Sequence, residues 1–150
     1  MEKYNLKSYE EEDFEYLYNL KKECFKWYVE KIYGPWEDEF QRKFLQDFFE
    51  EYKDVAKVIT LGDEKIGVFT SYVDDQNESV VSLFYIDKKY QGKGLGTEIL
   101  EEQLMEDQRN GRNTILQVFK ENPARLFYQK LGFKVYTETE THLKMRRNVE

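Results

Sequence analysis

The sequence predicts a mixed α/β fold for this chain of 150 residues, and three patterns support that class. Short runs rich in Val, Ile, Tyr and Phe alternate with longer segments whose apolar residues recur every three to four positions. Glycine, proline and asparagine mark the joints between these segments. Hydrophobic residues make up 40% of the chain, which excludes a disordered polymer. The predicted order is β-α-α-β-β-β-α-β-α-β-β.

Each predicted element is bounded by a start or stop signal. Ser8 and Glu11 have the spacing of a capping box before the first helix, and Gly34-Pro35 ends that helix. Phe40, Phe44 and Phe48 share one stripe of the second helix. The predicted strands are at 3–7, 55–61, 65–73, 79–86, 114–119, 133–138 and 142–145, and three of the helices are at 37–50, 95–109 and 123–131. The first helix is predicted to follow the capping box at Ser8 and to carry apolar residues at helical spacing from Phe14 to Ile32.

The most informative motif is the glycine-rich stretch 91–97, Gln-Gly-Lys-Gly-Leu-Gly-Thr, between a predicted strand and a predicted helix. Glycine lets the backbone turn tightly and approach a ligand closely. The free N–H groups and the positive dipole end of a helix N-terminus favour an anion. The stretch therefore predicts a pyrophosphate site. It lacks the Lys-Ser/Thr ending of a nucleotide-triphosphate loop, and its G-x-G-x-G spacing differs from the dinucleotide fingerprint.

A second motif spans residues 122–133 and has the start and stop signals of a short helix. Asn122 is a suitable N-cap, Pro123 suits the first helical position, and Gly132 is a suitable stop. Tyr128 falls on the apolar face of this helix. Spacing alone leaves two interpretations open, a core aromatic or a functional phenol.

The glycine-rich stretch resembles the acyl-coenzyme A signature of the GNAT superfamily of N-acetyltransferases. Gln91, Gly94 and Gly96 match its pattern Gln/Arg-x-x-Gly-x-Gly/Ala position by position. The preceding residues 83–90 are similar to the family's fourth strand and its approach to the loop. Lys88 departs from the family, because many members have a proline there; this changes the stiffness of the loop more than its chemistry.

The second motif is similar to the pattern Asn-x-x-Ala-x-x-x-Tyr-x-x-x-Gly-Phe of the same family. Asn122, Tyr128 and the pair Gly132-Phe133 match it, and the alanine slot falls at Ala124 or Arg125 depending on the alignment. In the family this tyrosine gives a proton to the departing coenzyme A thiolate, so the resemblance implies that role for Tyr128. The two motifs occur in the expected order, and the similarity in segment order covers nearly the whole chain.

The resemblance implies a GNAT-like fold, α/β of the mixed α+β kind. Its central twisted sheet would be mostly antiparallel, with about seven strands and helices on both faces. Residues 1–150 are expected to form a single N-acetyltransferase domain. The fourth and fifth strands would splay apart, with the pantetheine arm of acetyl-CoA between them. The implied cofactor-binding residues are Phe84, Tyr85, Ile86, Gln91, Gly92, Lys93, Gly94, Leu95, Gly96, Thr97, Asn122, Arg125 and Tyr128.

The implied reaction is acetyl transfer from acetyl-CoA, by direct attack, to a primary amine of a small molecule, peptide or protein. Glu78 is a candidate catalytic base, although it lies only at the start of its strand; a water chain reaching Ser82 or a backbone carbonyl fits equally well. Trp27, Tyr28 and Trp36 flank the break between the first two helices. They either bind the substrate in the acceptor cleft or simply pack.

Two other functions compete with the enzyme. A catalytically silent acyl-CoA-binding module, acting as a sensor or scaffold, would share the fold and the loop. The retained Tyr128 argues against it, because a pure binder needs no proton donor there. A nucleotide-binding protein would be stabilised by ATP or NAD rather than by coenzyme A.

The net charge and the counts of cysteine and histidine limit the kinds of partner and cofactor that this chain is expected to bind. The net charge of −7 disfavours nucleic acid and suits a cationic acceptor. Cys24 is the only cysteine, so no intrachain disulfide can form, and it is expected to be a small buried hydrophobe in a reducing compartment. With His142 as the only histidine, no metal site is expected. No apolar run approaches the length of a membrane span. A cytoplasmic protein that does not bind membranes, either monomer or homodimer, is expected.

Overall fold

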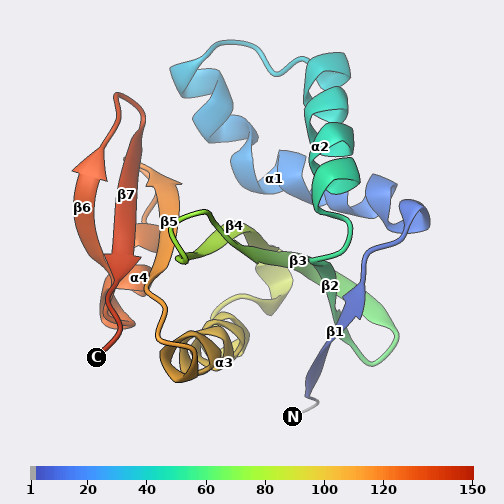
Figure 1. Ribbon diagram of the computed structural model, residues 1–150. Coiled ribbons are helices and arrows are strands. Elements are labelled where there is room, and N and C mark those ends of the chain that lie inside the picture. The colour runs from blue at the N-terminus through green and yellow to red at the C-terminus, as the bar shows by residue number, and fades with distance from the viewer. Residues whose placement is uncertain (1–2) are drawn as a thin grey trace. The chain divides into compact units, whose positions relative to one another are not determined.

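The structure, a computed structural model, describes residues 3–150, and its elements follow the predicted order (Figure 1). The strands are β1 Tyr4–Ser8, β2 Ala56–Leu61, β3 Glu64–Val73, β4 Ser79–Ile86, β5 Thr114–Phe119, β6 Lys134–Glu138 and β7 His142–Arg147. The helices are α1 Phe14–Ile32, α2 Asp38–Tyr52, α3 Leu95–Arg109 and α4 Ala124–Lys130, with short 3₁₀ turns η1 Glu11–Asp13 and η2 Lys88–Tyr90. Apart from the start of α1, boundaries differ from the predicted ones by at most two residues, the usual uncertainty at element ends.

The strands form one seven-stranded sheet in the order β1-β2-β3-β4-β5-β7-β6. It is mostly antiparallel, with one parallel pair, β4 and β5. This confirms the predicted fold class. The described pairing of β4 with β5 joins Ser79 to Thr114 and Val80 to Ile115, the first two residues of each strand. On its other edge, β5 pairs with β7 along its whole length, from Thr114 to Phe119.

The chain forms two compact units. The first contains the described residues up to Thr70 together with Leu83–Gly92, and the second contains Ser71–Ser82 and Lys93–Glu150. In the first unit, α1 and α2 contribute to one core, and Figure 1 shows both helices on the same side of β2 and β3. The fully buried members of this core are Leu17, Leu45, Ala56, Val58 and Val68.

Of the phenylalanine stripe on the second helix, only Phe48, which is half-buried, packs against the core. Phe40 and Phe44 are 62% and 56% exposed, whereas Leu45 and Phe49 are buried. Phe49 stacks on Tyr9 with 4.0 Å between the ring centroids. The buried face therefore lies one position further along the helix than the stripe.

The start of the first helix also differs from the prediction, so the Ser8–Glu11 capping box was wrong. Ser8 is the last residue of β1 and pairs with Lys57 of β2. The turn into the helix uses Asp13 instead, whose carboxylate accepts a hydrogen bond of 2.9 Å from the Glu10 N–H. Asp13 is fully buried, and the ammonium of Lys65 lies 2.6 Å from it.

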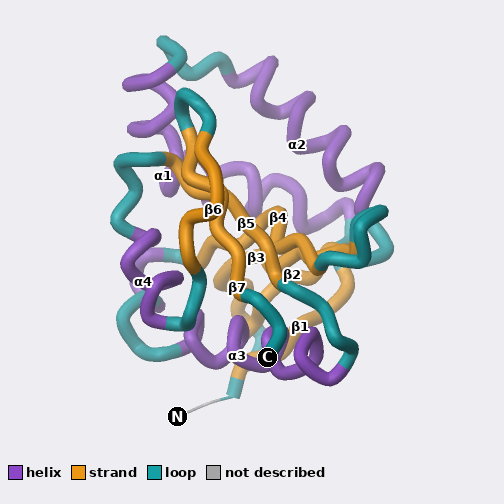
Figure 2. Tube along the Cα trace, turned by 60° about the vertical axis from the view of Figure 1, so that its left-hand side comes forward, coloured by secondary structure: helices purple, strands orange, loops and turns teal. Residues whose placement is uncertain are grey.

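In the second unit, strands β5, β7 and β6 run alongside one another (Figure 2). Helix α3 is held by apolar residues and by a buried polar contact. The Thr114 hydroxyl donates a hydrogen bond of 2.7 Å to the Asp107 carboxylate, which also accepts one of 3.0 Å from Gln103. Because both oxygens of Asp107 are satisfied, this contact fixes the C-terminal half of α3 against β5.

Candidate active site

The loop between β4 and α3 has the backbone that the glycine motif predicted. Gly92 and Gly94 have φ angles of 77° and 85°, in the left-handed region that other residues rarely adopt. A Cβ atom at either position would meet nothing within 4 Å, so it is the backbone conformation, rather than crowding, that requires glycine.

Helix α3 begins directly after this loop, with Gly94 as its N-cap and no side chain capping it. The first N–H groups of any helix lack intrahelical partners. Here they follow a loop in which Gly92 and Gly94 carry no side chain. A diphosphate would fit this arrangement, because it can accept hydrogen bonds from those amides and carries the charge that the helix dipole favours.

The end of β4 is tied to the loop by Gln91. Its side-chain amide donates a hydrogen bond of 2.7 Å to the carbonyl of Ile86. The backbone N–H of Asp87 donates to the Ile66 carbonyl of β3 at 2.8 Å, and the Asp87 carboxylate accepts from the Lys89 N–H at 3.2 Å. These bonds fix the path of the chain from the strand into the loop.

The side chains of Phe84 and Tyr85 serve packing. The Tyr85 hydroxyl donates to the Leu17 carbonyl at 3.0 Å in a buried contact, and the ring of Phe84 packs edge-on against Phe69, with centroids 5.1 Å apart. The resemblance assigns their backbone groups, rather than these side chains, to the cofactor.

Sequence reasoning missed Gly67, which lies in β3 close to this segment. A Cβ atom at Gly67 would lie 2.3 Å from the Tyr85 carbonyl oxygen, closer than any side chain allows. The lack of a side chain therefore permits close approach of β3 to Tyr85. A glycine inside an apolar strand was the available signal.

Tyr128 lies in α4 and is 8% exposed. Its ring packs edge-on against Phe127 and Phe133, with centroid distances of 5.2 and 5.8 Å. Burial raises the pKa of its hydroxyl to about 12, so the group stays protonated at neutral pH. Within the described residues that hydroxyl has no hydrogen-bond partner. It is a buried phenol with a proton to donate.

The N-cap of α4 is Pro123, one residue later than predicted, and the side-chain oxygen of Asn122 accepts a hydrogen bond of 2.9 Å from the Ala124 N–H at the start of the helix. Gly132 has a φ of 95°, which fits its predicted role after the helix end. Arg125 is exposed on the same helix. The predicted cofactor residues Phe84–Gly92 lie in the first unit, and the remaining ones lie in the second.

Glu78, the candidate base, is engaged in an ion pair. Its carboxylate lies 3.0 Å from the Arg146 guanidinium and accepts a hydrogen bond of 3.3 Å from Asn113. The guanidinium also stacks 4.0 Å from the centroid of Tyr136. Glu78 is only 9% exposed, and this arrangement favours a structural role.

The three aromatic residues near the break between α1 and α2 differ in their environment. Trp27 is 59% exposed, packs edge-on against Tyr28 and lies under the ammonium of Lys31. Trp36 belongs to the core, where its ring N–H donates to the Tyr18 hydroxyl at 2.9 Å and to Asp38 at 3.1 Å. Trp27 and Tyr28 remain the candidates for substrate contact, and the environment of Trp36 favours packing.

Cys24 is half-buried rather than fully buried. Its thiol lies 4.0 Å from the Ile86 carbonyl, and burial raises its pKa to about 11. A thiol with so high a pKa is a poor nucleophile. Among residues 3–150, no three His, Cys, Asp or Glu side chains form a cluster that could hold a metal ion. None of the helices in that range is both long and apolar enough to cross a membrane.

Comparison with known proteins identifies the class. Residues 52–135 match the family model described as the acetyltransferase (GNAT) domain. The chain therefore belongs to the GNAT family, and it is an acyltransferase of the acetyltransferase type. No curated protein sequence matched the chain.

Solved structures agree with the fold. An acetyltransferase from Thermus thermophilus aligns with a TM-score of 0.76 at 22% identity, covering 98% of this chain and 99% of its own. A protein from Pyrococcus horikoshii gives 0.76 at 19%, covering 99% of both chains. The PaiA N-acetyltransferase from Thermoplasma acidophilum, solved in complex with coenzyme A, gives 0.74 at 19%, covering 97% of this chain and 99% of its own. At these identities the likeness shows the fold.

Proposed function

We propose that this chain, as one domain over residues 1–150, transfers an acetyl group from acetyl-CoA to a primary amine of a small molecule, peptide or protein. One observation supports this most: in a GNAT chain, Gly92 and Gly94 take left-handed conformations directly before the uncapped N-terminus of α3. The coenzyme A complex of the similar PaiA N-acetyltransferase supports the same donor.

The donor would be held by main-chain groups. The amides from Gly92 to Thr97 would bind the diphosphate, and the backbone of Phe84, Tyr85 and Ile86 would bind the pantetheine arm. Asn122 and Arg125 would contribute further contacts to the donor. When bound, acetyl-CoA supplies an activated acyl group. The chain positions that group, donates a proton to the leaving thiolate and accepts one from the amine.

A backbone N–H of Tyr85 or Ile86 is the candidate donor to the thioester oxygen. A fixed donor of this kind contributes about 3–4 kcal/mol to acyl transfer. Its position depends on the close approach at Gly67 and on the Tyr85–Leu17 hydrogen bond. Binding both reactants together adds the advantage of proximity.

Tyr128 is the candidate general acid for the sulfur of the leaving thiolate. Burial raises the pKa of this phenol to about 12, so it carries its proton at neutral pH but is a weaker acid than an ordinary tyrosine. Burial in α4 also limits competition from water.

The acceptor amine must lose a proton, because a lysine-like amine has a pKa of about 10.4 and is mostly protonated at neutral pH. Glu78 could accept this proton only by giving up part of its ion pair with Arg146. That cost supports the alternative, a water relay ending at Ser82 or at a backbone carbonyl.

The test is to mix the protein with acetyl-CoA and a panel of amines, including a polyamine, free amino acids and peptides, and to follow release of free thiol. We expect release that depends on one class of amine. Tight binding of coenzyme A without turnover on any amine would instead support the silent sensor or scaffold. Stabilisation by ATP or NAD, but not by coenzyme A, would contradict both.

A further inference from the structure

The second unit contains a cavity of about 560 Å³. It lies between the C-terminal half of α3, the end of α4 and the end of β7, and this volume is within the range of small-molecule sites. The residues that line it are Glu101, Leu104, Met105, Gln108, Arg109, Lys130, Leu131, Arg147 and Glu150. None of them belongs to the predicted donor or acceptor site.

Three cationic side chains line this cavity, and none of them forms an ion pair within the described part of the chain. Arg109, Lys130 and Arg147 have no carboxylate of residues 3–150 within ion-pair distance. Glu101 and Glu150 also border the cavity, but they pair with none of the three. The lining side chains therefore carry one net positive charge, with three cationic groups that form no ion pair within residues 3–150.

Helix dipoles explain the positions of two of these three cations but not of the third. Arg109 and Lys130 stand in the last turns of α3 and α4, where a cation is stabilised by the helix itself. Arg147 stands on β7, and its side chain lies against the turn that ends α4: a Cβ atom at Gly132 would be 3.2 Å from its Nε. The missing side chain of Gly132 thus leaves room for this guanidinium beside the cavity.

The cavity also has an apolar part. Leu104 is buried, Leu131 is half-buried, and Met105 is 59% exposed. An exposed methionine next to unpaired cations is suited to a ligand with both an anionic group and an apolar portion. Arginine forks match a carboxylate with two parallel hydrogen bonds.

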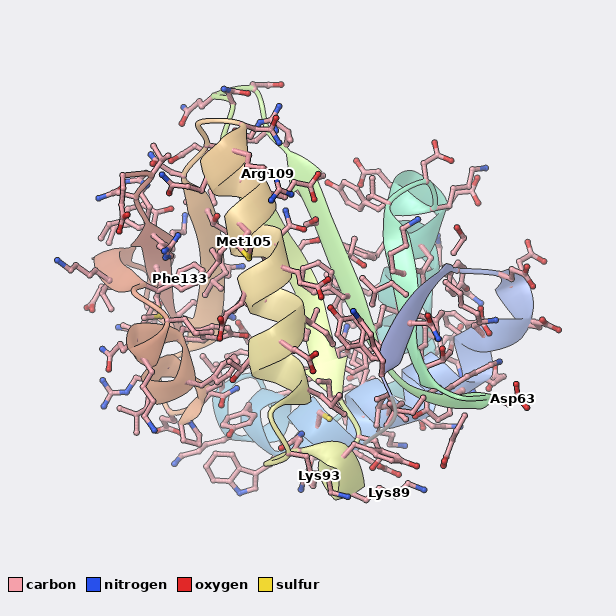
Figure 3. All side chains as sticks on the ribbon, turned by 90° about the horizontal axis from the view of Figure 1, so that it is seen from below. Asp63, Lys89, Lys93, Met105, Arg109 and Phe133 are labelled. Carbon is pink, nitrogen blue, oxygen red and sulfur yellow. The ribbon has the colours of Figure 1, made fainter. Side chains whose placement is uncertain are left out.

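The cavity is separate from the glycine loop. Glu101, the lining residue of α3 nearest that loop in sequence, is six residues beyond Leu95, about 9 Å along a helix, and Met105 is about 15 Å along it. Figure 3 shows Met105 and Arg109 toward one end of α3 and Lys93 at the other. A ligand bound here would leave the start of α3 accessible.

We propose that this cavity binds a small organic carboxylate with an aliphatic or aromatic portion. Its carboxylate would pair with Arg109, Lys130 and Arg147, and its apolar part would lie on Leu104, Met105 and Leu131.

The experiment is a titration of the ¹⁵N-labelled protein with octanoate, followed by backbone amide shifts in solution. We expect saturable shifts at Leu104, Met105 and Leu131, and no comparable shifts at Gly92, Gly94 or Gly96. Two matched probes separate the parts of the ligand: acetate carries the charge without the chain, and octanamide carries the chain without the charge. Both should bind at least about tenfold more weakly, because each lacks one of the two contacts.

Substitutions test which side chains contact octanoate. Arg147→Gln and Met105→Gln should each weaken octanoate binding about tenfold while retaining the dispersed spectrum of a folded protein. Lys134→Gln changes the charge of the same unit by the same amount, at an exposed position on β6, and should leave binding unchanged. The proposal is overturned if octanoate causes no saturable shifts at the three lining amides. It is also overturned if octanamide binds equally well, or if Lys134→Gln weakens binding as much as Arg147→Gln.

Discussion

The side-chain amide of Gln91 donates a hydrogen bond of 2.7 Å to the carbonyl of Ile86, five residues earlier in the chain. Ile86 ends β4, and Gln91 directly precedes Gly92, so this bond joins the strand end to the glycine loop. The turn η2 lies between them. The loop conformation should therefore depend on a side chain that need not touch the cofactor.

Replacing Gln91 with Glu removes the donor and keeps the shape of the side chain. The Ile86 carbonyl would lose its partner and face a carboxylate instead, at a cost of about 1–3 kcal/mol in unfolding free energy. We expect coenzyme A affinity, measured by calorimetry, to fall about tenfold. Gln129→Glu makes the same change at an exposed position of α4 and should alter neither quantity. Wild-type affinity in Gln91→Glu would mean that the loop keeps its shape without this bond.

Gly94→Glu should abolish coenzyme A binding. It places bulk and negative charge where the diphosphate would lie, and its left-handed φ costs a further ~1–2 kcal/mol for any residue with a Cβ. Gly111 provides a matched control at the opposite end of α3, because it also has a positive φ and a Cβ atom there would meet nothing within 4 Å. Gly111→Glu should lower stability similarly and retain coenzyme A binding. Equal coenzyme A affinities in the two variants would mean that the glycine loop does not bind the donor.

Tyr128→Phe should lower turnover by about 10²-fold or more and change coenzyme A affinity little, because general acid catalysis typically contributes that much. Steady-state kinetics with a calorimetric binding measurement separate the two effects. Unchanged turnover would make Tyr128 a packing residue.

The same tyrosine predicts a pH dependence of stability. Its pKa is about 12 in the folded protein against 10.0 as reference, so the folded state holds the proton more tightly. The resulting stabilisation is present below pH 10 and is lost as the pH rises toward 12, up to about 2.7 kcal/mol. Denaturant unfolding of the wild type and Tyr128→Phe across this range should show a smaller decline in the variant. Parallel curves would contradict the burial of this hydroxyl.

Glu78→Gln tests whether this carboxylate is a structural partner or a base. The ion pair with Arg146 predicts a loss of about 2 kcal/mol in unfolding free energy, with turnover of the folded protein within a few-fold of wild type. Arg146→Gln breaks the same pair and leaves the carboxylate in place, so it should destabilise comparably. A drop in turnover of about 10²-fold or more in Glu78→Gln alone would assign Glu78 as the base.

Local signals predicted most of the fold, whereas contacts between distant residues were not predictable. The bounds of β4, α3 and β5 and the left-handed Gly94 follow from runs, turns and glycines that act over a few residues. The pairing of Glu78 with Arg146 joins residues 68 positions apart, and no short-range pattern encodes it. The approach of Gly67 to Tyr85 likewise depends on how two strands meet.

The orientation of α2 shows the same limit and can be tested directly. Two stripes on this helix, one through Phe44 and one through Leu45, are both apolar, so periodicity alone did not identify the buried one. Leu45 is fully buried, whereas Phe44 is 56% exposed with the Lys21 ammonium 4.8 Å from its ring centroid. Leu45→Ala should therefore lower the unfolding free energy by about 2–5 kcal/mol.

Phe44→Ala removes a larger side chain from the neighbouring stripe and should cost less than about 1 kcal/mol, since little of its surface is withdrawn from water. Chemical denaturation of both variants under identical conditions measures the difference. If Phe44→Ala proved the more destabilising of the two, α2 would have to be rotated by about 100°, the angle between successive helical residues. Leu45 and Phe49 would then no longer form the contact between α2 and the first core.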